Sequence, residues 1–222
     1  MSDPYRAPVR SARLALITFT LFVSGGTFAQ QGPVLKGVLA TPPGATGNVS
    51  AYAIYLSGAR FKSLAQGTLE AGGAFTVTLP TAVPDSRLNP VEMATLCATG
   101  TANVSANPPG VLHAMTMFVM WLGEETGAGA LIASSDDVFD LLADQSGLRP
   151  GDFAVYHLYA AGPFRLTGTC VVPEGFPVEF AIDAPAGWSL VKYGHAGDDL
   201  GTVLVESIAS LPQEAQWRTF TE

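Results

Sequence analysis

Residues 152–193 carry the clearest pattern of apolar and polar positions in the chain. Residues 153–160 (FAVYHLYA) are largely apolar on both sides of an extended strand, which is typical of a strand covered on both faces. Residues 164–172, 178–183 and 188–193 follow as further strand segments, and Gly and Pro residues separate them. Because such residues mark turns, we predict four successive strands arranged as a meander.

Strand patterns continue on both sides of this stretch. They cover residues 34–40, 49–57, 74–79, 111–122 and 202–209. Residues 111–122 are apolar on both sides and predict a central, buried strand. Residues 91–97 fit either a short helix or a strand, and we favour a strand because it brings Cys97 into the sheet. Residues 102–110 are expected to be a loop, and residues 211–222 a polar tail.

One segment has the pattern of a helix instead. Residues 134–146 begin with Ser134, have Asp137 three residues later, and continue with Val138, Leu141 and Leu142 at helical spacing. This is a capping sequence followed by an apolar stripe. The predicted fold class is therefore mainly β, an antiparallel β-sandwich architecture with one short helix at about 134–146.

The N-terminus has the three parts of a secretory signal. Arg6, Arg10 and Arg13 precede the apolar residues 14–23, and Thr27-Phe28-Ala29 supplies small residues for cleavage after Ala29,. An uncleaved N-terminal anchor is the alternative. We expect a signal peptide over residues 1–29, and a secreted or extracytoplasmic protein located in the periplasm or at the cell surface.

Residues 34–80 resemble the prealbumin-like modules of carboxypeptidase regulatory-like domains. The resemblance lies in an early strand at Gly37-Val38, the strand of residues 49–56, and the segment of residues 73–80 (GAFTVTLP). This chain has Gly72 where the family often has an acidic residue. The resemblance implies a small sandwich with a structural or binding role at residues 30–82. A larger antiparallel β-unit with one helix is then expected at residues 91–222.

The later half is similar to uncharacterised secreted bacterial β-sandwich proteins. The similarity rests on residues 156–160, on Gly168-Thr169-Cys170, and on Gly187-Trp188 before a strand, although one extra residue separates the two tyrosines here. It implies an extracytoplasmic location and a β architecture. It implies no activity.

The charge of the chain limits its partners. The net charge is −8, and removal of the arginine-rich signal makes the remaining chain more acidic still. An acidic surface does not favour contacts with nucleic-acid phosphates or anionic lipids. We therefore expect an unknown protein or carbohydrate partner, no nucleic acid, and no stable membrane insertion after signal cleavage.

Cys97 and Cys170 are the two cysteines of the chain. In a secreted protein two cysteines most simply form one disulfide, and two buried free thiols are the alternative. A redox role would need a C-x-x-C spacing, which the sequence lacks.

No local motif for catalysis, metal or cofactor binding stands out, so no catalytic, metal or cofactor residue is assigned and no cofactor is expected. His157 lies within an apolar strand, where it is either a buried structural histidine or a base in a groove. His195, with Asp198 and Asp199 on a Gly-rich turn, is either part of a solvated turn or part of a cation site. Four aromatic residues could form an exposed binding face, but we favour core and rim packing for them: Tyr156, Tyr159, Trp188 and Tyr193.

These observations lead to a non-catalytic binding or structural β-module of the cell envelope or extracellular space. An extracytoplasmic hydrolase that uses His157 or His195 is one alternative. A carrier that holds an apolar ligand between sheets is another, and it requires an enclosed apolar cavity.

Overall fold

The computed structural model describes residues 32–55, 58–92, 96–98, 103–122, 129–135, 150–173, 175–196 and 199–220. Its strands are β1 (Val34–Val38), β2 (Gly47–Tyr55), β3 (Gly58–Leu69), β4 (Ala74–Thr78), β5 (Asn89–Pro90), β6 (Asn103–Asn107), β7 (Leu112–Leu122), β8 (Gly129–Ser134), β9 (Phe153–Ala160), β10 (Phe164–Val171), β11 (Pro177–Ala184), β12 (Gly187–Ala196), β13 (Asp199–Ile208) and β14 (Gln216–Phe220). One short 3-10 helix lies at Asp85–Arg87.

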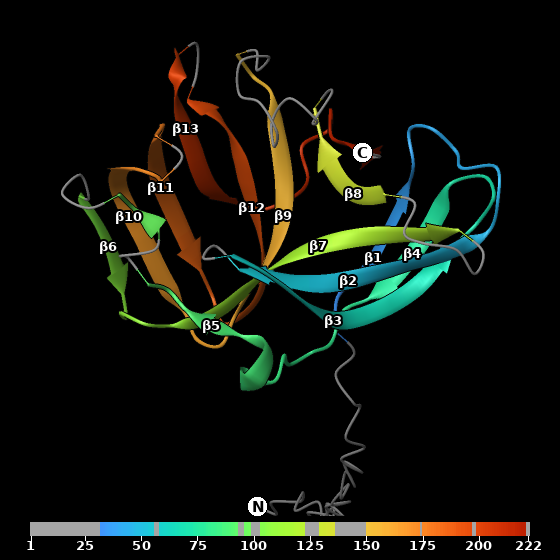
Figure 1. The fold of residues 1–222 in the computed structure, drawn as a ribbon, viewed down its shortest axis with the longest axis horizontal. Helices are drawn as coiled ribbons and strands as arrows, with labels where there is room; N and C mark the ends of the chain where they lie inside the picture. Colours follow the sequence, from blue (N-terminus) through green and yellow to red (C-terminus); the bar gives the residue numbers. More distant parts are fainter. Residues whose placement is uncertain are drawn as a thin grey trace, which may run out of the picture. The chain divides into compact units, whose positions relative to one another are not determined.

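The strands of the described residues join in one sheet of the order β1-β4-β3-β2-β7-β8-β9-β12-β13-β11-β10-β6, with β14 beside β8 and β5 beside β7. Figure 1 shows β1 to β4 on one side, β6, β10 and β11 on the other, and β9 with β12 between them. The pairs are antiparallel except for β11 with β13, which are parallel over Val178–Ala181. The expected mainly-β fold is confirmed.

Strand β9 is paired along both of its edges. One edge pairs with β12 over its whole length, while the other pairs with β8 near the start and with β7 from His157 to Ala160. All eight of its residues are buried. The sequence analysis predicted a strand that is covered on both faces, and the burial of all eight residues agrees with this.

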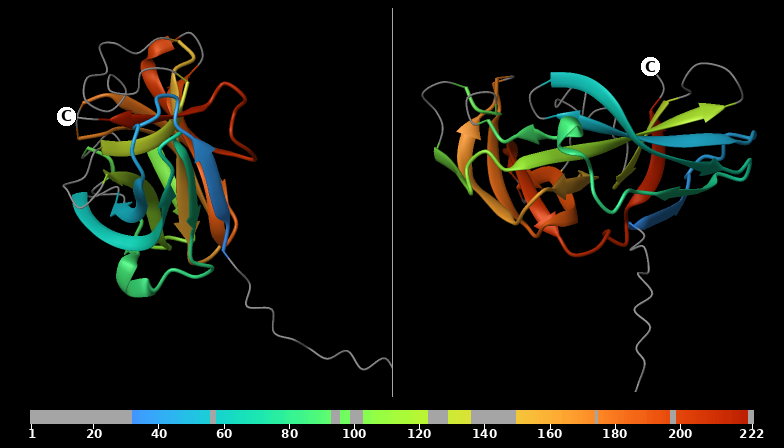
Figure 2. Two further views of the ribbon diagram at one scale, coloured as in Figure 1. Left: turned by 90° about the vertical axis from the view of Figure 1, so that its right-hand side faces the viewer. Right: turned by 90° about the horizontal axis from the view of Figure 1, so that it is seen from below.

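Two hydrophobic cores lie against opposite faces of β9. Phe153 and Val155 belong to a core with residues of β2, β4, β7, β8 and β14. Leu158 and Ala160 face the other way and belong to a core with β10, β11 and β13. Since successive side chains of a strand point to opposite faces, this alternation assigns one set of residues to each core. The same two groups of strands are seen from two further directions in Figure 2.

Trp217 of β14 fills the first of these cores. Its ring meets Phe75 edge-on with centroids 5.0 Å apart and Phe118 with centroids 5.6 Å apart. Its backbone carbonyl accepts a hydrogen bond from the Ala40 N–H, so β14 also meets the residues after β1. Gly37 lies under the indole, where a Cβ would come within 2.5 Å of the ring. A side chain at position 37 would therefore displace Trp217.

Cys97 and Cys170 form the predicted disulfide, with their Cα atoms 5.7 Å apart. Both cysteines are buried in the second core. Beside the bond, the Ala98 N–H donates to the Val171 carbonyl. The disulfide therefore holds residues 96–98 against the end of β10, and its presence is typical of oxidising compartments.

Most of the predicted strands are present, but their order differs from the prediction. The four segments after residue 152 are β9 to β12. Of the three turns between them, just the one from β10 to β11 joins paired neighbours. The meander was wrong because β7, β8 and β12 already occupy both edges of β9. The expected loop at 102–110 and the expected polar tail contain β6 and β14, and β3 was also missed.

Two other predicted segments differ or lie outside the description. The strand expected at residues 91–97 is wrong, because the Leu96 N–H donates to the Glu92 carbonyl, which is the spacing of a helical turn,. Ser134, the predicted start of the helix at 134–146, is instead the last residue of β8. The rest of that helix, residues 136–146, lies outside the described residues, as does the predicted signal peptide at 1–29.

The domain boundaries stay predictions. Strands β1 to β4, which fall within the module expected at 30–82, are neighbours in the sheet. Strand β2 then pairs with β7 from Gly47 to Ile54. The sheet is therefore continuous from the first predicted module to the second.

Replacing both cysteines by alanine should lower the free energy of unfolding by about 4 kcal/mol, because the bond closes a sequence separation of 73 residues,. Urea denaturation of the oxidised protein and of the double variant measures the difference. The oxidised and reduced wild-type proteins give an independent comparison. Equal unfolding midpoints for all three forms would contradict a stabilising role.

Candidate functional site

A cleft of about 460 Å³ lies between β1 and three other strand ends. These are the end of β11, the start of β12 and the end of β13. Apolar side chains dominate its walls, and the polar lining groups are His157, Asp183, Ser189 and Ser207. The lining residues are Pro33, Leu35, His157, Asp183, Pro185, Trp188, Ser189, Leu190, Ser207, Ile208 and Ala209. Its volume lies in the range of small-molecule sites, about 300–1,000 Å³.

His157 forms part of the cleft wall and is 5% exposed. Its imidazole stacks on the Trp217 ring with centroids 6.4 Å apart and an interplanar angle of 14°. It also meets the Phe118 ring edge-on with centroids 5.6 Å apart. Aromatic packing therefore holds the orientation of the imidazole.

Burial sets the charge state of His157. Loss of solvent lowers the pKa of its imidazole from 6.5 to about 4, because the cationic form is penalised in an apolar environment. The ring is consequently neutral at pH 7. Its Nδ1 atom is buried and has no hydrogen-bond partner among the described residues.

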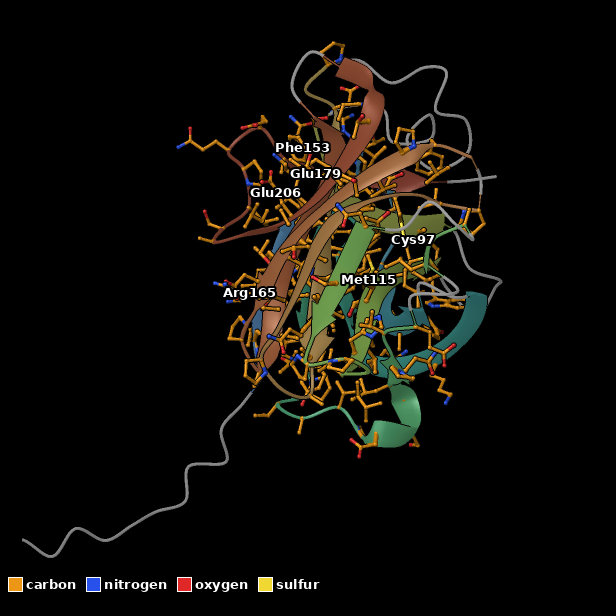
Figure 3. The ribbon with its side chains drawn as sticks, turned by 90° about the vertical axis from the view of Figure 1, so that its left-hand side faces the viewer. Cys97, Met115, Phe153, Arg165, Glu179 and Glu206 are labelled. Carbon is orange, nitrogen blue, oxygen red and sulfur yellow. A yellow bond between two sulfur atoms is a disulfide. The ribbon has the colours of Figure 1, made fainter. Side chains whose placement is uncertain are left out.

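Two other polar groups of the cleft have different roles. The Ser189 Oγ is also buried and lacks a partner in the described part of the chain. Asp183 is already bound at the rim, where Arg165 donates to the Asp183 Oδ2 over 2.6 Å and 2.9 Å. Figure 3 labels Arg165 of β10, Glu179 of β11 and Glu206 of β13. The cleft therefore offers neutral polar groups inside and a paired carboxylate at its edge.

The other two histidines lie apart from the cleft. His113 is 3% exposed and lines a cavity of about 20 Å³ in the core that contains the disulfide. Burial lowers the pKa of His113, although the backbone of Asn89 and Val111 offsets part of the effect. His195, near the end of β12, has two buried ring nitrogens without a partner among the described residues. The structure thus brings none of the three histidines together.

The turn with His195, Asp198 and Asp199, for which a cation site was the alternative to a solvated turn, lies partly outside the described residues. Asp198 is not described, and Asp199 is the first residue of β13. No group of three or more His, Cys, Asp or Glu side chains suited to a metal ion is present in the described ranges. No helix of those ranges is long and apolar enough to cross a membrane.

The aromatic residues noted in the sequence mostly contribute to packing. Tyr156 and Tyr159 are 9% and 8% exposed, and burial raises the pKa of the Tyr156 hydroxyl. Trp188 meets the Tyr159 ring with centroids 5.2 Å apart and donates its indole N–H to the Pro80 carbonyl. These contacts agree with core packing and not with an exposed carbohydrate-binding platform.

Sequence reasoning singled out His157 but missed the cleft around it. Pro33 and Leu35 of the opposite wall lie more than a hundred residues before His157 in the chain. Trp217, which supports the imidazole, lies in the segment expected to be a tail. Its large apolar ring in a polar C-terminal segment was the one signal for a buried position there.

Comparison with protein-family models, with curated proteins and with solved structures finds no match. The resemblances to prealbumin-like modules and to secreted bacterial β-sandwich proteins therefore stay predictions.

Replacing His157 by Phe should flatten the dependence of stability on pH. Below pH 6.5 the His157 imidazole is protonated in the unfolded chain, whereas in the folded protein it stays neutral until the pH falls to about 4. The wild-type free energy of unfolding should therefore fall by about 3 kcal/mol more than that of His157→Phe between pH 7 and pH 4. Urea denaturation at several pH values measures both slopes.

Phe118→Leu is the matched control for this substitution. It disturbs the same ring cluster without removing a titratable group, so its stability loss should be the same at every pH. Parallel pH profiles for the wild type and His157→Phe would show that His157 titrates normally in the folded protein.

Proposed function

We propose that the protein is an extracytoplasmic binding module that holds an apolar group of its ligand in the cleft beside His157. The observation that carries this proposal is the cleft itself, an apolar site of about 460 Å³ with a neutral imidazole in its wall. Binding sites are typically apolar with a few placed polar groups. His157, Ser189 and Ser207 are the neutral polar residues of the cleft lining.

The proposed location rests on two independent features. The N-terminal residues have the pattern of a signal cleaved near Ala29,. The Cys97–Cys170 disulfide favours an oxidising compartment. Secretion to the periplasm or the cell surface accounts for both.

A binding role is preferred to hydrolysis because of the chemistry around His157. A hydrolase would need a histidine in hydrogen-bond contact with a nucleophile or a carboxylate. No such contact of a histidine is found among the described residues. A base with a pKa of about 4 also accepts protons weakly at neutral pH,.

A binding role is also preferred to transport of an enclosed apolar ligand. The cavity in the core with the disulfide holds about 20 Å³, which is roughly the space of one water molecule. The larger cleft is open to solvent on one side. An occupant of this cleft would be partly exposed, which suits a group presented by a partner.

Fragment screening by ¹H–¹⁵N NMR tests the proposed site. Small aromatic and aliphatic fragments should shift the amide signals of Leu35, Leu190 and Ile208. Ala209→Trp should weaken the best fragment about tenfold or more, because the indole would occupy the rim of the cleft,.

Ala181→Trp is the matched control, since Ala181 is exposed on β11 and does not line the cleft. It should leave fragment binding unchanged. Shifts scattered over the surface, or equal effects of the two tryptophans, would contradict the proposed site. Turnover of p-nitrophenyl acetate that His157→Phe abolishes would favour the hydrolase instead.

A further inference from the structure

The hydrogen bonds of β1 define which of its residues face β4. The Leu79 N–H donates to the Pro33 carbonyl, and the Leu39 N–H donates to the Gly73 carbonyl, both over 3.0 Å. In an antiparallel pair, residues alternate between those that bond the partner strand and those that do not. The odd-numbered residues 33–39 therefore direct their backbone groups toward β4.

The even-numbered residues of β1 direct theirs toward the opposite edge. Ala40 follows this rule, since its N–H donates to the Trp217 carbonyl over 2.8 Å. At Val38 this edge is already in use, because the parallel bridge between Leu39 and Trp217 directs the Trp217 N–H to the Val38 carbonyl. No described residue pairs with the same edge at Val34 and Lys36. Their N–H and C=O groups thus continue the ladder that begins at Ala40 and Trp217, but without a strand to receive them.

The side chains on this edge are unusual for a solvent-exposed strand. Val34 is 46% exposed and Val38 is 63% exposed. Such an edge invites pairing with another chain. The two valines flank Lys36 on the same face of β1, so an added strand would cover both.

The cleft lies on the other face of the same strand. Leu35, which points away from Val34 and Lys36, lines it together with Pro33. A strand paired with the free edge of β1 would alternate in the same way. Its side chains beside Leu35 would enter the cleft, and those beside Lys36 would stay outside.

We propose that β1 accepts an extended peptide segment of a partner protein as an added strand, and that this strand places an apolar side chain in the cleft. This inference rests on the proposed function, since it names the ligand of the same site. Backbone hydrogen bonds to Val34, to Lys36 and to the Val38 N–H supply affinity, and the cleft supplies selectivity. The segment carries a large apolar residue beside Leu35 and an acidic residue opposite Lys36.

A second copy of this chain is a poorer occupant than a different protein. The antiparallel pairing of two β1 strands that aligns Val34 with Val38 also sets Lys36 opposite Lys36. Like charges directly opposite each other destabilise a pair of strands. The net charge of −8 on each chain adds to the repulsion.

The test compares two substitutions at Lys36. Proline removes the outward N–H and places its ring at the free edge, but the bonds to β4 come from the odd-numbered residues and remain. Alanine removes the same charge and keeps the N–H. Twelve-residue peptides selected from a displayed random library on the secreted wild-type protein are synthesised, and calorimetry measures their binding.

Lys36→Pro should weaken the selected peptides about tenfold or more, whereas Lys36→Ala should weaken them less than about threefold. Thermal unfolding checks that both variants are folded. In the wild type, the amides of Lys36 and Val38 should exchange rapidly when free and slowly when the peptide is bound. Those amides have no partner among the described residues.

The outcomes separate this inference from the proposed function. One outcome is that Ala209→Trp abolishes peptide binding while Lys36→Pro leaves it unchanged. This result would keep the cleft as the binding site and overturn strand addition. Selection that yields no binder would also overturn it. Slow exchange of Lys36 and Val38 in a free protein that sediments as a dimer would assign the edge to a second copy instead.

Discussion

The structure depends on the pairing of β9 along both of its edges. A strand between β12 on one side and β7 with β8 on the other has no free backbone group to place in water. Its side chains alternate between two faces, and here each face meets a hydrophobic core. Every residue of β9 is therefore buried, and the strand contributes Phe153 and Val155 to one core and Leu158 and Ala160 to the other.

This arrangement determines where the cleft forms. His157 lies on the face of β9 that meets the core around Trp217, opposite Leu190 of β12. Trp217 supports one side of the imidazole, and the covering strand β1 lies across the cleft from β13. A buried histidine is tolerated there because it is neutral at pH 7,. The cleft thus lies beside a strand that is paired along both of its edges.

The sequence predicted the strands with strong alternation and missed those without it. Strands β10 and β11 alternate with a period of two, and β7 and β9 are long segments that are apolar on both sides, so each pattern is readily detected,. Strand β6 (NVSAN) alternates between exposed and half-buried residues, and β14 buries Trp217 within a short polar segment. The order of the strands was not predictable from local pattern, because the choice of neighbour depends on which edges other strands occupy. His157 was noticed as an unusual residue, but its cleft joins four separate parts of the chain, at residues 33–35, 157, 183–190 and 207–209.

The two ends of the strand order differ in a way that bears on recognition. Strand β6 presents Asn103, Ser105 and Asn107 as its exposed side chains, and polar residues on an edge reduce pairing with other chains. Strand β1 presents two exposed valines around a single lysine, and it borders the cleft that contains His157. Polar groups protect one edge, whereas the other combines unpaired backbone groups with an adjacent apolar site. Among the described strands, that asymmetry is the reason for proposing the edge of β1, rather than the edge of β6, as the place where a partner strand is added.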